Sequence, residues 1–314
     1  MMNQYFAQLP LQQVLITGGT GFIGHELVSQ LLAAGHRVSL FSRRPEQALR
    51  TFTAQGAAGQ ITAFSDWNSL DSNAQFDAVI NLAGSPVVGP RWSAARKQVL
   101  RDSRVGLTNQ LFGWLQRATH KPAVLINGSA IGYYGCRGDE PLDENASPQN
   151  EFMSDLCREW EEAAIKAEAF GVRVVRLRLG LVFGPGGAFP KLLLPFKLGV
   201  GGRMGDGRQV MSWVHRNDVI AVIARAIANP DMRGAYNMTA PQAPTQAEFA
   251  ALAAKLLHRP NLFVTPACVL ELLLGEMAAL FTKGQRVVPK RLLDEGYQFE
   301  FATLEAAIQD ELRA

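Results

Sequence analysis

A glycine-rich stretch near the amino terminus, TGGTGFIG from Thr17 to Gly24, carries the clearest chemical signal in the chain. It lies between an apolar run and an amphipathic segment that begins near Ile23. Glycines at such positions permit a sharp turn, let a pyrophosphate approach the backbone and let the following helix pack closely on the strand. We therefore predict that this turn binds a dinucleotide; a glycine turn without a ligand is the alternative. The predicted contacts are Gly18, Thr20, Gly21, Phe22, Ile23 and Gly24.

The end of the second apolar run indicates which dinucleotide is bound. The run closes with Leu40-Phe41-Ser42-Arg43-Arg44, and no carboxylate stands nearby. An acidic residue here would hold a ribose 2′-hydroxyl, whereas a basic one would accept a 2′-phosphate. Because a guanidinium binds phosphate through two parallel hydrogen bonds, Ser42, Arg43 and Arg44 favour NADP over NAD. The alternative is that both arginines are solvated surface residues.

These residues must be positioned by a sheet, and the first 184 residues alternate strand-length apolar runs with helical stretches. Nearly continuous apolar strands are typical of a parallel sheet covered by helices on both faces. We predict an α/β fold with a doubly wound parallel sheet of the Rossmann type over residues 12–184. The rhythm breaks after the glycine-rich residues 184–187. We expect residues 185–314 to form a smaller C-terminal substrate-binding region, with 212–239 returning to the main domain.

Composition limits the classes of function. The 314 residues are 47% hydrophobic and 19% charged with a net charge of +3, which indicates a compact globule and predicts no nucleic-acid partner. The three cysteines form no CxxC pair, and the five histidines show no metal spacing, so we predict no metal site. The apolar run 269–281 is interrupted by Glu271 and Glu276 and is too short to span a bilayer. We expect a cytoplasmic protein with no membrane contact.

Several motifs together resemble the extended short-chain dehydrogenase/reductase superfamily. They are TGGTGFIG, NLAG at 81–84, INGSA at 126–130 and RLGLVFGPGG at 178–187. Further matches, including Asp102-Ser103-Arg104, Leu156 to Glu161 and Ser212 to His215, are similar to its atypical subgroup of epimerase-family, or sugar-nucleotide-epimerase-like, proteins. The resemblance covers nearly the whole chain and implies a small-molecule substrate and a possible homodimer through the helices after the fourth and fifth strands.

The resemblance also implies places for the cofactor. Ser42 with Arg43 would take the 2′-phosphate, and Arg104 would reach the cofactor from the helix after the fourth strand. The remaining residues are implied to line the adenosine half (Leu82, Ala83, Gly84) or the nicotinamide side (Gly128, Ser129, Leu181).

Members of this superfamily that oxidise or reduce carbonyls use a Tyr-x-x-x-Lys pair, which this sequence lacks. Cys157 and Glu161 stand where the pair is expected. We expect Cys157 to be a small core residue and Glu161 to lie on a solvated helical face. Ser129 is the predicted residue that polarises a substrate oxygen, and Tyr133 or Tyr134, in the loop that follows, is the predicted proton donor.

Two functions remain open from the sequence. The first is an NADP-binding oxidoreductase or epimerase-like enzyme that acts on a small polar carbonyl or a sugar-derived compound. The alternative is a non-catalytic protein that binds and senses NADP(H). The intact cofactor pattern supports both, the serine and the two tyrosines favour the enzyme, and the missing Tyr-x-x-x-Lys pair favours the sensor.

Overall fold

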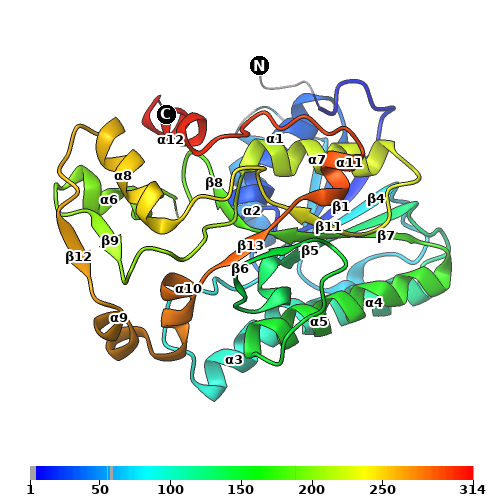
Figure 1. Cartoon of the computed structure of the whole chain (residues 1–314). Helices are drawn as coiled ribbons and strands as arrows, with labels where there is room; N and C mark the ends of the chain where they lie inside the picture. Colours follow the sequence, from blue (N-terminus) through cyan, green and yellow to red (C-terminus); the bar gives the residue numbers. More distant parts are fainter. Residues whose placement is uncertain (1–4, 55, 57–58, 188, 314) are drawn as a thin grey trace.

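The chain is built on a seven-stranded parallel sheet in the order β11-β7-β5-β4-β1-β2-β3 (Figure 1). A computed structural model describes residues 5–54, 56, 59–187 and 189–313. The strand order reverses between β1 and β4, and ligands bind outside the carboxyl ends of the strands at such a switch point. The strands are β1 (Gln13–Thr17), β2 (Arg37–Phe41), β3 (Ile61–Phe64), β4 (Ala78–Asn81), β5 (Val124–Ala130), β7 (Arg173–Leu179) and β11 (Gly234–Met238).

Helices cover both faces of this sheet, as expected from the continuous apolar strands. Val14 and Ile16 of β1 pack in one cluster with residues of α1, α2 and α7, whereas Leu15 packs in another with residues of α4 and α5. This alternation follows from the two-residue period of a strand. The covering elements are α1 (Phe22–Ala33), α2 (Pro45–Thr53), η1 (Trp67–Ser69), α3 (Ala94–Arg101), η2 (Asp102–Gly106), α4 (Leu107–Arg117), α5 (Phe152–Ile165), η4 (Lys166–Phe170) and α7 (Arg216–Ala228).

The second region, which lies to the left of the sheet in Figure 1, has its own small core. Phe183 stacks on Phe189 at a centroid distance of 4.0 Å and on Trp213 at 5.4 Å. Its parallel strand pairs are β8 (Leu181–Phe183) with β10 (Trp213–His215), and β9 (Gly202–Met204) with β12 (Phe263–Thr265). Its helices are α6 (Phe189–Lys197), α8 (Gln246–Leu256), α9 (Ala267–Leu274), η5 (Gly275–Ala278), α10 (Ala279–Thr282) and α12 (Leu304–Arg313).

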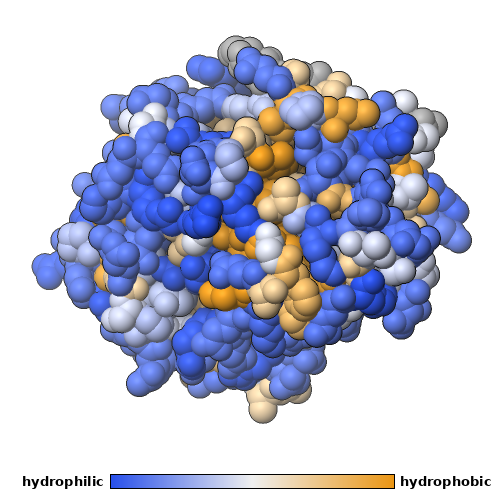
Figure 2. Space-filling view, turned by 90° about the vertical axis from the view of Figure 1, so that its right-hand side faces the viewer, coloured by the Kyte–Doolittle hydropathy of each residue, from blue (hydrophilic) through white to orange (hydrophobic). Residues whose placement is uncertain are grey.

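The chain crosses between the two regions more than once. After β10 it runs through α7 and adds β11 to the edge of the main sheet. Later, β13 (Gln285–Val287) pairs with β6 (Gly138–Leu142), which follows the short helix η3 (Ile131–Tyr134), and α11 (Lys290–Asp294) packs near β11. On the side away from the second region the surface is largely hydrophilic, with apolar residues confined to a narrow band (Figure 2). No helix in the described ranges is long and apolar enough to cross a membrane.

A buried histidine joins β10, α7 and the C-terminal helix. The Nδ1 atom of His215 accepts a hydrogen bond from the Asn217 N–H and so caps α7, while Nε2 lies 3.2 Å from Asp310 Oδ2. The imidazole stacks on Phe301 at 3.7 Å and is fully buried. Burial lowers the pKa of His215 to about 4, although the carboxylate of Asp310 opposes this effect.

We expect His215 to make the fold sensitive to acid. The unfolded chain takes up this proton near pH 6.5 and the folded chain only near pH 4, so stability is lost as the pH falls between these values. The loss reaches about 3 kcal/mol, because one pKa unit corresponds to about 1.4 kcal/mol. Urea unfolding of wild type and His215→Asn, whose amide keeps a capping oxygen, measures it. Equal pH dependence in both proteins would contradict the assignment.

Candidate functional site

The glycine-rich turn forms an open cradle at the carboxyl end of β1. Gly18 has φ +74°, and a Cβ there would lie 2.7 Å from the Leu82 carbonyl carbon. A Cβ on Gly24 would lie 2.2 Å from the Gly18 carbonyl oxygen, so both positions require glycine. Gly21 precedes α1, and no side chain caps the first turn of this helix. Thr20 and Gly21 are exposed, so the first N–H groups of α1 are available to an anion.

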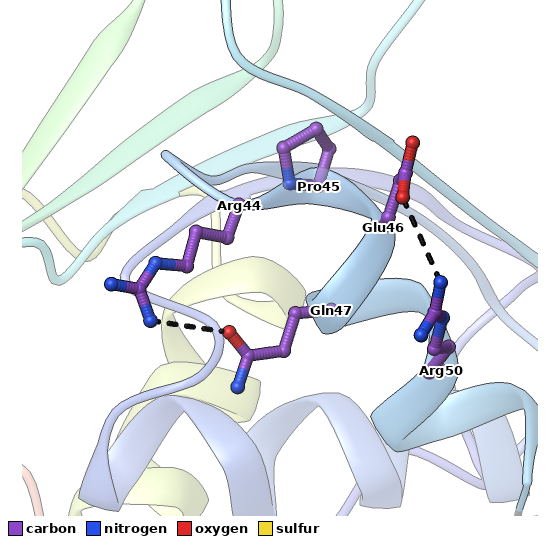
Figure 3. A pocket seen from close by; sticks show the side chains of 5 residues that line it. All are labelled: Arg44, Pro45, Glu46, Gln47 and Arg50. Carbon is purple, nitrogen blue, oxygen red and sulfur yellow. Dashed lines mark hydrogen bonds and ion pairs between the residues drawn. The ribbon is translucent and has the colours of Figure 1, made fainter.

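The second predicted contact region lies at the end of β2. The Ser42 hydroxyl accepts a hydrogen bond from the Arg44 N–H at 3.2 Å, which orders the turn into α2, and the Arg43 side chain is exposed. The Arg44 guanidinium reaches Gln47 at 3.5 Å across a shallow pocket (Figure 3). The pocket is lined by Arg44, Pro45, Glu46, Gln47 and Arg50. The guanidinium groups of Arg43 and Arg44 therefore face solvent at the end of β2, where the sequence predicts the 2′-phosphate.

The third region, after β4, brings Arg104 against residues 82–84. A Cβ on Gly84 would lie 3.0 Å from the Arg104 guanidinium, which donates a hydrogen bond to the Ser85 carbonyl oxygen at 3.0 Å. Arg104 belongs to η2, a π-helical turn between α3 and α4, and its guanidinium lies 5.4 Å from the Trp160 ring. Burial lowers the pKa of Arg104. The structure thus places the predicted residue beside the predicted loop.

Beneath these loops a buried amide ties three strand ends together. Asn81 accepts a hydrogen bond from the Thr17 hydroxyl at 2.6 Å and donates to Asn127 at 2.6 Å and to Thr108 at 2.8 Å. The Trp160 indole also donates to the Thr108 hydroxyl, at 3.1 Å. These bonds hold β1, β4, β5 and α4 in register at the site. Sequence reasoning assigned Asn81 no role, although an asparagine closing an otherwise apolar strand is a signal for such a bond.

Ser129, at the end of β5, does not present a free hydroxyl. Its side chain is 1% exposed, and its hydroxyl donates to Glu161 Oε1 at 2.7 Å. Since a hydroxyl has one proton, it cannot also donate to a substrate oxygen in this arrangement. The prediction that Glu161 lies on a solvated face is wrong: its side chain is 3% exposed because α5 turns it toward the sheet.

Glu161 is the counter-ion of two arginines on β7. Arg178 donates to both of its carboxylate oxygens, from Nε at 2.8 Å and from Nη2 at 3.0 Å, and Arg176 adds a bond of 2.9 Å. Together with Ser129, each carboxylate oxygen accepts two hydrogen bonds. Burial alone would lower the pKa of Arg178, but the bonds and charge of Glu161 outweigh burial and raise it. The carboxylate is therefore saturated and structural.

The two candidate tyrosines differ in their surroundings. Tyr134 is fully buried; its hydroxyl donates to Asn237 at 2.6 Å and accepts from Arg178 at 2.8 Å. Burial raises the pKa of Tyr134 to about 12, although Arg178 opposes this effect. Tyr133 is only half-buried, and its ring lies against the Arg178 guanidinium. Of the two phenols, Tyr133 is the one that is partly exposed to solvent.

The remaining predicted residues differ in their exposure to solvent. Gly128 is buried, and a Cβ there would lie 3.1 Å from the Trp160 ring, so a larger residue would displace that ring. Leu181, on β8, is 43% exposed and offers an apolar side chain to solvent. Cys157 is buried as expected, and burial raises its pKa to about 12. No group of three potential metal ligands occurs in the part of the chain that the structure describes.

The parallel sheet, the glycine turn at its switch point and the basic residue after β2 define a dinucleotide-binding α/β protein. The NAD dependent epimerase/dehydratase family matches residues 14–239, and a domain of unknown function, DUF1731, matches residues 265–311. The chain belongs to this epimerase/dehydratase family. This confirms both the predicted α/β fold and the resemblance to atypical epimerase-family proteins.

Similar proteins share almost the full length. The epimerase family protein YfhF of Bacillus subtilis is 35% identical, covering 94% of this chain and 96% of its own. The chloroplastic SDR39U1 homolog of Arabidopsis thaliana is 34% identical, with 94% and 85% covered. The crystal structure of human epimerase family protein SDR39U1 with NADPH has a TM-score of 0.84 and 32% identity, with 96% and 99% covered.

We predict that Glu161→Gln strongly destabilises the fold, because it leaves Arg176 and Arg178 without their buried counter-ion. Breaking a buried ion pair costs about 3–5 kcal/mol. The double variant Glu161→Gln/Arg178→Met should lose less free energy of unfolding than the two single variants lose in sum, because the two residues interact. Urea denaturation of the four proteins measures this coupling. Strictly additive losses would contradict it.

Proposed function

We propose that this chain binds NADP(H) and exchanges a hydride with a small polar carbonyl or a sugar-derived compound. The observation that carries the proposal is the open glycine cradle facing a switch point, with exposed Arg43 after β2 in place of a carboxylate. The NADPH in the human relative's structure supports the choice of cofactor. The residues present fit this group, because Gly18 and Gly24 allow the close turn before α1 and no side chain caps the first turn of this helix.

Each part of the cofactor has residues suited to hold it. The first N–H groups of α1 would bind the pyrophosphate, and Ser42 with Arg43 the 2′-phosphate. Arg104 would contact the cofactor from η2, and exposed Leu181 would give the nicotinamide an apolar neighbour. NADPH, when bound, supplies the hydride.

Tyr133 is the proposed proton donor to the carbonyl oxygen of the substrate. It is half-buried, whereas the Ser129 hydroxyl is committed to Glu161 and the Tyr134 hydroxyl to Asn237. In this proposal Ser129 does not contact the substrate oxygen and instead helps to hold Glu161 in place. Of the two tyrosines that the sequence left open as proton donor, the proposal keeps Tyr133.

A second candidate function is a protein that binds NADP(H) without turnover and senses it. The observation that favours it is the buried Cys157 and the saturated Glu161 where relatives that catalyse redox chemistry carry tyrosine and lysine. Neither side chain can transfer a proton in this arrangement. The two functions share the cofactor site and differ in whether a hydride is exchanged with a substrate.

The choice of cofactor can be tested by calorimetric titration. We expect Arg43→Ala to weaken NADPH binding by roughly 10- to 100-fold and to leave NADH binding unchanged, because a hydrogen bond between charged groups contributes about 1.5–3 kcal/mol. Arg37→Ala, at the other end of the same strand and also exposed, is the matched control and should alter neither affinity. An unchanged ratio of NADPH to NADH affinity in Arg43→Ala would refute the 2′-phosphate assignment.

Turnover separates the enzyme from the sensor. We expect wild type to oxidise NADPH in the presence of at least one member of a panel of polar aldehydes, ketones and sugar-derived carbonyls. Tyr133→Phe should lower kcat by roughly 10²–10⁴-fold, the usual contribution of a general acid. Tyr5→Phe is the control, because it removes a phenol hydroxyl that donates to Glu300 and not to the site. NADPH binding without oxidation by any member would favour the sensor.

A further inference from the structure

The Tyr133 ring has an unusual neighbour for a proposed proton donor. The guanidinium carbon of Arg178 lies 3.5 Å from the ring centroid, well within the range of a cation–π interaction. Tyr133 comes from η3, directly after β5, whereas Arg178 comes from β7, where it is the register partner of Ser129. The contact therefore forms at the carboxyl end of the sheet, where ligands bind in this class of fold.

The guanidinium is fixed in place by its other contacts. Nε and Nη2 bind Glu161, and Nη1 donates to the Tyr134 hydroxyl at 2.8 Å and to the Glu144 carbonyl oxygen at 3.2 Å. With its donors committed on three sides, the group cannot rotate without breaking buried bonds. On the other side, the Ser154 hydroxyl donates to the Tyr133 carbonyl oxygen at 2.5 Å. Arg178 therefore contacts the ring of Tyr133, and Ser154 holds its backbone.

The charges around the ring leave an excess of positive charge. Glu161 is one carboxylate against the two guanidinium groups of Arg176 and Arg178. The nearby Glu144 carboxylate is not part of this ion-paired group; it accepts hydrogen bonds from the backbone N–H groups of Asn237 and Arg291. The group of Glu161, Arg176 and Arg178, which the Tyr133 ring borders through Arg178, therefore carries one net positive charge.

We infer that Arg178 takes the place of the missing lysine: from β7 it orients the Tyr133 ring and supplies the positive charge beside it. This rests on the proposed function of Tyr133. When the phenol gives its proton to the substrate oxygen, the O–H electron pair stays on the phenol oxygen. The negative charge then lies against a cation that is already in position, so little reorganisation is needed. Arg178 is a positioning residue, because it acts through Tyr133.

The contact can be measured without a substrate. We would place 3-fluorotyrosine at position 133 and record ¹⁹F NMR spectra of wild type and of Arg178→Met, in which Arg176 still balances Glu161. The resonance should move and broaden when the guanidinium is lost. Arg173→Met is the matched control, since Arg173 lies on the same strand but binds the Met232 and Ala226 carbonyl oxygens. A resonance unchanged by Arg178→Met would overturn the inference.

Kinetics test the catalytic half in a double-mutant cycle. Arg178→Met should lower kcat by roughly 100-fold, the cost of a misplaced catalytic group, without raising KM for NADPH. Arg178→Lys keeps the charge and should recover part of this loss, and it also serves if Arg178→Met fails to fold. In the Tyr133→Phe background, Arg178→Met should have no further effect.

The two ways of failing are distinguishable. Equal losses of kcat from Arg178→Met in both backgrounds would show that Arg178 acts independently of Tyr133 and would overturn the inference alone. A wild-type protein without turnover would refute the proposed function and the catalytic half of the inference. The ¹⁹F spectra would still decide whether Arg178 holds the ring.

Discussion

The site depends on one buried charge. Glu161, enclosed between α5 and the sheet, binds two arginines of β7 and the hydroxyl of Ser129. A carboxylate in such a place is stable only when its oxygens are fully hydrogen-bonded and its charge is balanced, and here both conditions are met. The positions of Tyr134 and Tyr133 depend on Glu161 in turn, because Arg178, which Glu161 holds, contacts both tyrosines.

The cofactor half of the site could be predicted from sequence because its requirements are local. A glycine is needed where the backbone turns with φ +74° or where two segments nearly touch, and these needs show as the pattern TGGTGFIG. The alternation of apolar runs likewise indicates the sheet, since each strand is buried on both faces. The prediction for Arg104 came from the family resemblance alone, because nothing in its immediate sequence indicates cofactor binding.

The surroundings of the proposed proton donor could not be predicted in the same way, because their contacts link distant segments. Glu161 follows Glu159 on one helix, and their spacing alone does not show which of them faces the sheet. Arg176 and Arg178 alternate with apolar residues on a central strand, where charge is costly without a partner. That pattern was a usable signal for a buried counter-ion. The distinction between Tyr133 and Tyr134 depends on Asn237, more than a hundred residues away.

The π-helical turn Asp102–Gly106 changes the direction in which the helix faces between α3 and α4. A π-turn contains one residue more per hydrogen-bonded ring than an α-turn. The extra residue rotates the residues after the turn by about 100° relative to an uninterrupted α-helix. Arg104 lies inside this turn, so its guanidinium reaches the Ser85 carbonyl oxygen while Leu111 and Trp114 of α4 stay packed in the core.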